Sequence, residues 1–484
     1  MAMMNLKQVA QIFGAKSVGS LVAGFSAVST DTRHIKEGDL FVALRGPNFD
    51  AHEFLALARE NGAVGAVVDH IVVGETLPQI VVKDTRIALG RLAAVWREGF
   101  TGTVIGVTGS NGKTTVKEML ASILHQQKTR QGAVLATEGN LNNDIGVPLM
   151  LLRLEPQTHC CAVLEMGANH VGEIGYLSGL VKPDVAIITN AAAAHLEGFG
   201  SLDDVARAKG EIWQGLTPTG VAVINADDAY AGYWRELVGD HRIMTFGLVP
   251  GADICLGEGG AHWSWREGEA AGFQNQFLLQ TTQGNIPITM ALAGKHNVTN
   301  AIAAAAVAIA AGVTLDDVQA GLAAIKPVKG RLHPSRSATG QLVIDDSYNA
   351  NPHSMSAAID VLAQSNALTV LVVGDMAELG ADAGRLHHQV GERARKKGIK
   401  QLLAVGPHSK ETVRGFGDNG VWFESQAQLI QHLSSQLQRC SQEAVVLVKG
   451  SRSSAMERVV EALLVPADNA PGKVSEVAHA DLPR

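Results

Sequence analysis

Short apolar runs rich in β-branched residues alternate with helix-like segments along most of this chain. Examples are FVAL at 41–44, TVIGV at 103–107, VAVIN at 221–225 and LTVLVV at 368–373. Strands that are buried on both faces of a parallel sheet have this composition, and helices cross between them. We therefore predict an α/β fold with mainly parallel sheets. A length of 484 residues predicts about three domains, because a domain usually contains roughly 100 to 200 residues.

Two breaks in this alternation mark the predicted domain boundaries. The first is the segment WREGFTG near residue 101, and the second is IKPVKGRLHP near residue 328. They define domains at 1–101, 102–328 and 329–466, and we expect the polar residues 467–484 to form a flexible tail. Within the second domain, the Trp- and Gly-rich residues 235–290 are typical of an insertion. Residues 294–312 predict a helix that is closed by Gly312.

Composition excludes several classes of protein. The net charge is −7 and no long basic run occurs, which argues against a nucleic-acid surface. The four cysteines, at 160, 161, 255 and 440, form no C-x-x-C pair, as expected in a reducing compartment. No apolar run is long enough to span a bilayer. We therefore expect a cytoplasmic protein without a membrane segment and without a nucleic-acid partner.

The segment GVTGSNGKTTVKEM at 106–119 joins a predicted strand to a predicted helix. Its glycine spacing departs from the usual phosphate loop, which would have a glycine at Val107. Backbone N–H groups of 109–114 can still surround a polyphosphate at the positive end of the helix, with Lys113 on the β and γ oxygens and Thr114 on Mg²⁺. The predicted ATP contacts in this loop are Gly109, Ser110, Asn111, Gly112, Lys113, Thr114 and Thr115. The alternative is an ordinary glycine-rich turn with a solvated lysine.

Three further residues follow predicted strands or lie on a predicted helix, and each of them alone is weak evidence for a functional site. Glu165 ends a strand and can either complete an Mg²⁺ shell or act as a solvated or helix-capping carboxylate. His195 follows another strand, where a single histidine is more often structural. Lys209 lies on a predicted helix, and the default for such a lysine is a solvated surface charge.

Four residues farther along the chain have side chains suited to a nucleotide. Asn297 and Asn300 can read a base edge, Arg331 can hold a phosphate with two hydrogen bonds, and Asp346 can accept ribose hydroxyls. Capping or turn formation is the alternative for each.

These segments occur in one order that resembles the Mur ligases of peptidoglycan synthesis. The segments are TGSNGKTT, EMGANH, NAAAAHLEGFG, ARAKGEI, GKHNVTNAIAA, GRLH, DDSYNANPHSM, VVGDMAELG and VKGSRSSAMERVV. The resemblance covers nearly the whole chain apart from the tail. It implies an N-terminal domain for a UDP-muramoyl substrate, a central ATPase domain of the P-loop type, and a Rossmann-like C-terminal domain that closes over the active site.

The resemblance also assigns roles to individual residues. It implies that Thr114, Glu165, His195 and Lys209 hold two Mg²⁺ ions, Lys209 as a carbamate, and that Lys113, Glu165, His195 and Lys209 are catalytic. It implies ATP contacts for Asn297, Asn300, Arg331 and Asp346. The implied substrate contacts are Ser29, Asp31, Arg33, Asn48, Asp50, His52, Thr137, Asn140, Asn143, Asn349 and Asn351.

The activity that the resemblance implies is ATP-dependent formation of an amide bond through an acyl phosphate. YNANPHSM stands where the diaminopimelate-adding member carries D-N-P-R, and this favours the dipeptide-adding member. Its expected substrates are UDP-N-acetylmuramoyl-tripeptide and D-alanyl-D-alanine, and we expect a monomer. A folylpolyglutamate synthetase is the nearest alternative enzyme, but its phosphate loop should lie near the chain start. A nucleotide-controlled binding protein is the alternative from another class.

Overall fold

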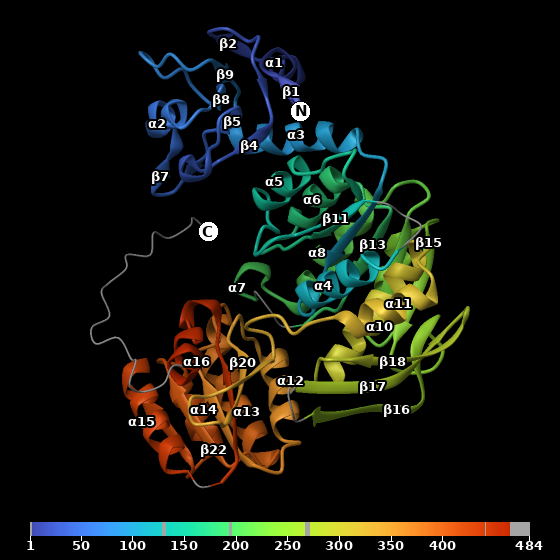
Figure 1. Cartoon of the computed structure of the whole chain (residues 1–484), viewed down its shortest axis with the longest axis vertical. Coiled ribbons are helices and arrows are strands. Elements are labelled where there is room, and N and C mark those ends of the chain that lie inside the picture. The colour runs from blue at the N-terminus through green and yellow to red at the C-terminus, as the bar shows by residue number, and fades with distance from the viewer. Residues whose placement is uncertain (1, 128–131, 193–195, 267–271, 441, 465–484) are drawn as a thin grey trace.

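The computed structural model describes residues 2–127, 132–192, 196–266, 272–440 and 442–464. Three α/β units follow one another from the N-terminus to the C-terminus (Figure 1). The predicted α/β class with mainly parallel sheets is confirmed. Three of the four runs singled out in the sequence are strands, and the fourth, at 41–44, overlaps the end of a strand at Asp39–Val42. The predicted boundary near residue 101 falls between α3 (Thr85–Glu98) and β10 (Thr103–Thr108). The predicted tail, 467–484, lies outside the described residues.

The N-terminal unit has a five-stranded sheet in the order β2-β9-β8-β5-β4, in which only β2 is antiparallel to its neighbour. Asn5 and Gln8 form a capping box at the start of its first helix, and Gly14 ends that helix in the left-handed conformation. Besides α3, its elements are β1 (Met4–Asn5), α1 (Leu6–Phe13), β2 (Lys16–Val18), β3 (Gly24–Phe25), β4 (Ala27–Ser29), η1 (Thr32–His34), β5 (Asp39–Val42), β6 (Arg45–Gly46), β7 (Phe49–Asp50), η2 (Ala51–Phe54), α2 (Leu55–Glu60), β8 (Gly65–Val68) and β9 (Gln79–Val81).

The central unit has a nine-stranded sheet in the order β11-β12-β10-β13-β14-β15-β16-β17-β18. Neighbours from β11 to β16 are parallel, and the last two pairs are antiparallel. Besides β10, its elements are α4 (Lys113–Leu124), β11 (Ala133–Ala136), α5 (Gly146–Leu152), β12 (His159–Glu165), α6 (Glu173–Val181), β13 (Val185–Ile188), α7 (Leu196–Phe199), α8 (Leu202–Gly210), η3 (Glu211–Gly215), β14 (Val221–Asn225), α9 (Ala231–Val238), β15 (Arg242–Gly247), β16 (Ile254–Arg266), β17 (Gly272–Thr281), β18 (Gly284–Met290), α10 (Lys295–Ala310) and α11 (Leu315–Ala324).

Two sequence predictions bear on this unit. The segment 235–290, which the sequence predicts to be an insertion, contributes β15 to β18 to the central sheet: β15 and β16 continue its parallel part, and β17 and β18 extend it by antiparallel pairing. The predicted helix at 294–312 is confirmed as α10, and Gly312 follows its end with φ +83°. The Gly312 N–H donates to the Ile309 carbonyl (3.0 Å), so this glycine closes the helix as expected.

The C-terminal unit has a six-stranded sheet in the order β19-β20-β24-β21-β22-β23, parallel except for β19. Helices cover both faces, as in doubly wound folds. Its elements are β19 (His333–Arg336), β20 (Leu342–Asp346), α12 (Pro352–Leu362), β21 (Leu368–Val373), η4 (Gly380–Asp382), α13 (Ala383–Lys396), β22 (Gln401–Val405), α14 (Ser409–Phe416), β23 (Gly420–Phe423), α15 (Gln426–Arg439), β24 (Ala444–Lys449), η5 (Arg452–Ser454) and α16 (Glu457–Leu464).

The three units are joined unequally. One continuous apolar core runs from Leu6 in α1 to Val238 in α9 and so spans the N-terminal and central units. At this junction the buried Arg97 donates to the carbonyls of Val181 (2.9 Å), Phe100 (2.8 Å) and Lys182 (3.1 Å). The C-terminal unit has two cores of its own, and its main apolar contact with the central unit is at Phe273 and Ala293.

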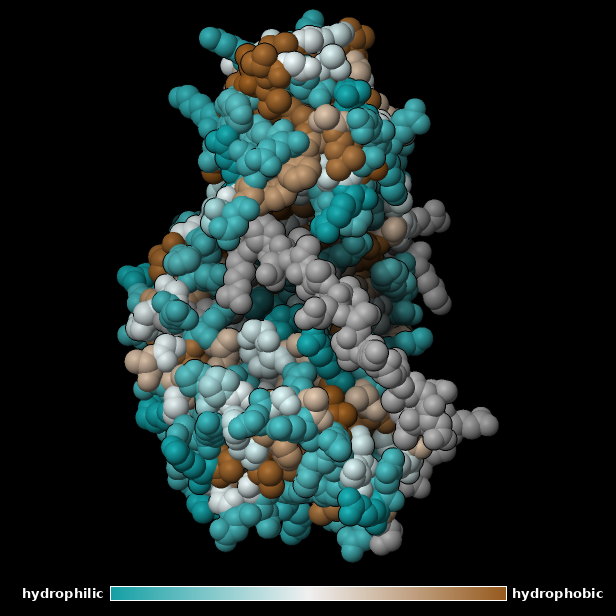
Figure 2. Space-filling model, turned by 90° about the vertical axis from the view of Figure 1, so that its left-hand side faces the viewer, coloured by the Kyte–Doolittle hydropathy of each residue, from teal (hydrophilic) through white to brown (hydrophobic). Residues whose placement is uncertain are grey.

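None of the described helices is long and apolar enough to span a bilayer. Figure 2 shows a face that is mostly hydrophilic, with apolar patches at the top of the molecule over the N-terminal unit. The exposed large apolar residues of that unit are Val18, Val22, Phe49, Leu57, Ile71, Val73 and Ile87.

Candidate active site

A cleft of about 1830 Å³ lies between the central and C-terminal units. It is lined by the loop after β10, by the first turns of α10 and α12, and by loops at the carboxyl ends of β12, β21 and β24. Open parallel sheets bind ligands at the carboxyl ends of their strands. In this structure, carboxyl ends of strands from both the central and the C-terminal sheet face the cleft.

The loop between β10 and α4 depends on two glycines. Gly109 and Gly112 have φ of +144° and +84°. A β-carbon at Gly109 would lie 1.9 Å from Thr189 Oγ1, and one at Gly112 would lie 2.4 Å from Asn300 Oδ1. No side chain caps the first turn of α4, so its N–H groups remain available to an anion at the positive end of the helix.

The loop is held by a residue that sequence analysis did not identify. The N–H groups of Ser110 and Asn111, which are predicted to contact ATP, both donate to Asn190 in this structure, one to its carbonyl (3.0 Å) and one to its side-chain oxygen (3.0 Å). The Asn190 side chain also donates to the Asn111 carbonyl (3.1 Å). Asn190 therefore fixes the shape of the loop in this structure. Sequence analysis missed this residue because it is distant in the chain.

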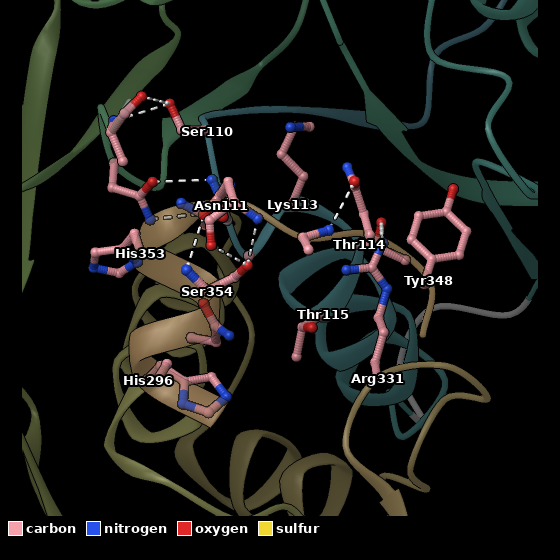
Figure 3. A pocket seen from close by; sticks show the side chains of 18 of the residues that line it. Ser110, Asn111, Lys113, Thr114, Thr115, His296, Arg331, Tyr348, His353 and Ser354 are labelled. Atoms are coloured by element: carbon pink, nitrogen blue, oxygen red, sulfur yellow. Dashed lines mark hydrogen bonds between the residues drawn. The ribbon is translucent and has the colours of Figure 1, made fainter. Parts of the chain in front are cut away.

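Lys113 folds back over the loop. Its Nζ donates to the Gly109 carbonyl at 2.6 Å, and the side chain lines the cleft. Figure 3 shows it beside Asn111 and Thr114. Burial lowers the pKa of Lys113; the nearby Glu165 carboxylate raises it, and the Arg331 guanidinium lowers it. The ammonium thus lies within the loop that a phosphate would enter.

Thr114, Glu165 and Arg331 meet at the start of α4 although they are distant in sequence. The Thr114 hydroxyl donates to Glu165 Oε2 (3.2 Å) and accepts from Arg331 Nη2 (2.9 Å). Glu165 is 1% exposed, and its backbone N–H donates to Thr137 Oγ1 (2.8 Å). Its second oxygen, Oε1, is buried and has no hydrogen-bond partner within the described ranges. A buried carboxylate oxygen beside a hydroxyl is a suitable donor set for Mg²⁺.

Lys209 is not the solvated surface lysine that its helical position suggested. Only 2% of the residue is exposed, and its Nζ lies 5.3 Å from the centre of the Phe199 ring. Burial lowers its pKa to about 7, and the positive charge of Lys113 adds to this, while Glu173 and Glu211 oppose it. A neutral amine is therefore accessible at neutral pH. His195, the other predicted ligand of this group, lies outside the described residues.

The predicted nucleotide contacts of α10 and β20 line the same cleft. Asn297 donates to the Ala293 carbonyl (2.8 Å) and accepts from Asn300 (3.2 Å). Asp346 accepts from the Leu332 N–H (3.1 Å) and pairs with the buried Lys449 (2.6 Å), which sequence analysis did not single out. Burial raises the pKa of Asp346, and the Lys449 ammonium opposes this.

The predicted substrate contacts are divided between two places. Asn140, Asn143, Asn349 and Asn351 line the cleft. Asn351 caps α12 and donates to Asn111 Oδ1 (2.7 Å), which links the C-terminal unit to the loop after β10. Thr137 is 1% exposed and supports Glu165 in this conformation. The N-terminal contacts Ser29, Asp31, Arg33, Asn48, Asp50 and His52 do not line this cleft.

Comparison with known proteins decides the family. Residues 107–308 match the Mur ligase middle domain, and residues 330–452 match the Mur ligase, glutamate ligase domain. The chain is 45% identical to the UDP-N-acetylmuramoyl-tripeptide--D-alanyl-D-alanine ligase of Escherichia coli K12, over 96% of this chain and 99% of that protein. The chain belongs to the Mur ligase family.

Solved Mur ligases have the same architecture. The crystal structure of MurF from Acinetobacter baumannii superposes with a TM-score of 0.88 at 39% identity, over 95% of this chain and 98% of that one. MurF from Thermotoga maritima in complex with ADP gives 0.79 at 28% identity, over 91% and 98%. This Mur ligase is therefore an ATP-dependent ligase. The similarity to these ligases extends over the N-terminal unit. It therefore argues against the two alternatives, a folylpolyglutamate synthetase and a nucleotide-controlled binding protein.

Proposed function

We propose that this Mur ligase joins D-alanyl-D-alanine to UDP-N-acetylmuramoyl-tripeptide, in the cytoplasm and as a monomer. The observation that carries the proposal is the 45% identity, over nearly the full length, to the Escherichia coli enzyme of that name. The cleft supports it, because Lys113, Thr114, Glu165 and Arg331 converge where a phosphoryl group would be transferred.

The chemistry explains why ATP is required. A carboxylate is a poor electrophile, since an attacking amine would have to expel oxide from an anion. In the proposed reaction, a carboxylate oxygen of the tripeptide attacks the γ-phosphorus and ADP leaves, which forms an acyl phosphate. The dipeptide amine then attacks the acyl carbon, the carbon–oxygen bond to phosphate breaks, and the nitrogen loses a proton. The products are the amide, ADP and phosphate.

The residues of the loop suit the first step, in which two anions meet. The N–H groups at the start of α4 and the Lys113 ammonium hold the terminal phosphates. Arg331 donates to the Thr114 hydroxyl, which places its guanidinium beside the same phosphates. Preorganised positive groups of this kind stabilise the charge that develops during phosphoryl transfer. Asn297, Asn300 and Asp346 are the proposed contacts with the rest of ATP.

The donor set fits Mg²⁺, because Glu165 Oε1 is buried without a partner among the described residues and the Thr114 hydroxyl lies beside Oε2. Thr114 and Glu165 would hold one ion, and His195 with Lys209 as a carbamate would hold a second. Bound Mg²⁺ supplies positive charge to the phosphate oxygens. Asn349 and Asn351 are proposed dipeptide contacts, and the N-terminal residues Ser29, Asp31, Arg33, Asn48, Asp50 and His52 are proposed for the UDP-sugar, with Thr137, Asn140 and Asn143 beside it.

The proposed function predicts that rapid phosphate release requires both substrates. We expect little phosphate from ATP with either substrate alone, and stoichiometric phosphate and a new amide product with both. Phosphate release and mass spectrometry of the UDP product measure this directly. D-Glutamate and diaminopimelate serve as control acceptors, and equal turnover with either of them would reject the assignment.

The glycine before Lys113 gives a second prediction. We expect Gly112→Ala to weaken ATP binding about tenfold or more, because its β-carbon would lie 2.4 Å from Asn300 Oδ1 at a φ of +84°, a conformation that costs about 1–3 kcal/mol for other residues. Isothermal titration with ATP measures the loss. Gly340→Ala is the matched control, since its φ is +85° and no atom lies within 4 Å of the added carbon. Unchanged ATP affinity in Gly112→Ala would place the nucleotide elsewhere.

A further inference from the structure

One side chain of the C-terminal unit reaches across the cleft to the phosphate loop of the central unit. Arg331 lies just before β19, and its Nη2 donates to the Thr114 hydroxyl at 2.9 Å. This hydrogen bond fixes the position of one guanidinium nitrogen, but it does not fix the plane of the group, which can still turn about the bond. A guanidinium that is to act on a phosphate therefore needs a second contact that sets its orientation.

The aromatic ring of Tyr348 supplies this second contact. The guanidinium carbon of Arg331 lies over the ring, 4.4 Å from its centre, which is well within the limit of about 6 Å for a cation–π interaction. Both side chains line the cleft, and Figure 3 shows them beside Thr114. A planar guanidinium stacks on an aromatic face. The ring thus restricts the plane of the group, while Thr114 holds one of its nitrogens.

The backbone of Tyr348 is held against the segment that carries Arg331. The Tyr348 N–H donates to the Gly330 carbonyl at 3.1 Å, and the Gly330 N–H donates to the Asp345 side chain at 3.1 Å. A β-carbon at Gly330 would lie 3.1 Å from the β-carbon of Tyr348, at a φ of +78°. Glycine therefore permits a close approach that other residues would hinder. The ring and the arginine are placed next to each other by this contact.

The loop that carries Tyr348 is fixed from its other side by Lys449. Asp346 and Lys449 are register partners at the carboxyl ends of the parallel strands β20 and β24. The Lys449 ammonium pairs with the Asp346 carboxylate (2.6 Å) and donates to the Asn349 carbonyl (2.8 Å). Lys449 is buried. One ammonium group thus holds the chain both before and after Tyr348, and the fold sets the position of the ring.

We propose that Tyr348 is a positioning residue for phosphoryl transfer, whose ring holds the Arg331 guanidinium beside Thr114 in the orientation that the transferred phosphate meets. A charge that is already oriented needs no reorganisation when negative charge develops on the phosphate. Tyr348 acts through Arg331, and its ring carries the role. The inference rests on the proposed function, and it adds a residue to which the sequence resemblance gives no role.

Steady-state phosphate release with Tyr348→Leu and Tyr348→Phe tests the inference. We expect Tyr348→Leu to lower kcat about tenfold, as for the loss of a cation–π contact in a partly desolvated site. The KM for the UDP substrate should stay close to wild type. Tyr348→Phe keeps the ring and should recover most of the loss. Tyr233→Leu is the matched control, because this tyrosine of α9 is 37% exposed and does not line the cleft.

A double-mutant cycle separates positioning from a general structural role. The variants are Tyr348→Leu, Arg331→Met and the two together, each checked by thermal unfolding. Because the ring acts through the arginine, the double variant should be no slower than Arg331→Met alone. A ring that only supports the fold would instead cause the same loss in both backgrounds.

A fluorinated ring tests the same point without removing the side chain, which matters if Tyr348→Leu does not fold. Trifluorophenylalanine at position 348 keeps nearly the shape of phenylalanine, but its ring face is less negative, so it attracts a cation less strongly. We expect kcat to fall about threefold or more relative to Tyr348→Phe, with an unchanged KM for the UDP substrate.

The outcomes distinguish two failures. A wild-type enzyme that does not ligate D-alanyl-D-alanine to UDP-N-acetylmuramoyl-tripeptide overturns the proposed function. A wild-type enzyme that does, together with a folded Tyr348→Leu variant of normal kcat, overturns the positioning role alone. Equal losses from Tyr348→Leu with and without Arg331 also overturn it, and so does a fluorinated enzyme that is as fast as Tyr348→Phe.

Discussion

Lys113→Ala is expected to lower the rate of ligation by at least about 10²- to 10³-fold, the loss typical of removing one preorganised donor from a developing charge. The Lys113 Nζ lies within the loop, 2.6 Å from the Gly109 carbonyl. A phosphate that enters the loop would interact with the positive charge of this ammonium. Within the part of the chain that the structure describes, the Lys113 ammonium donates to this loop alone, so we expect the variant to fold. Pre-steady-state phosphate release and thermal unfolding measure the two effects separately.

Lys182→Ala provides the control for this prediction. It removes an exposed lysine of the central unit that pairs with Glu98, and we expect wild-type turnover. Near-normal activity of Lys113→Ala would mean that the segment 106–119 is an ordinary turn between a strand and a helix. The proposed phosphate site would then be wrong, even though the family assignment would stand.

Lys209→Ala and Lys209→Arg are both expected to lower the activity at least about a hundredfold. Substituting a residue that only hydrogen-bonds to a metal ligand already lowers metal affinity or activity about 10- to 100-fold. As a carbamate, Lys209 would offer an anionic oxygen, the type of ligand that Mg²⁺ prefers. Arginine keeps a positive charge and supplies no such oxygen. Formate or acetate should partly restore the alanine variant by occupying the vacant position, and a fully active arginine variant would contradict the proposal.

The pH dependence of carbamate formation follows from the pKa of about 7 for Lys209. Only the neutral amine captures CO₂, so uptake should change most steeply around pH 7, rising above it and falling below it as the amine is protonated. Carbon-13 NMR with labelled bicarbonate detects the carbamate directly, without turnover. Arg207→Ala is the control on the same helix, because this side chain is 59% exposed and pairs with Asp204. It should keep both the signal and the activity.

The local part of the site could be predicted from sequence. The strand, glycine loop and helix at 103–124 follow from short-range pattern, and the structure has β10, the loop and α4 there. Pattern also placed Glu165 at a strand end, although it did not decide between a metal ligand and a solvated carboxylate.

The rest depends on contacts between distant segments. Lys209 is buried because of the tertiary neighbours of α8, such as Phe199, and helical spacing alone gave the opposite expectation. Asn190 accepts hydrogen bonds from two N–H groups of a loop that lies about eighty positions earlier in the chain, and no local pattern reveals this contact. The strands of 254–290 were recognisable as strands, but pairing partners are set by the whole sheet.

Because one apolar core runs from α1 to α9, we expect the first two units to unfold together as one cooperative unit. Removing residues 1–101 would uncover the faces of α5 and α6 that α3 now covers, so the central unit cannot be expressed alone without a solvent-exposed apolar surface. The C-terminal unit meets the central unit at Phe273 and Ala293 and takes no part in the described core that joins the first two units. Exchange of the C-terminal unit as a module therefore has to match the contact at Phe273 and Ala293, whereas the first two units have to change together.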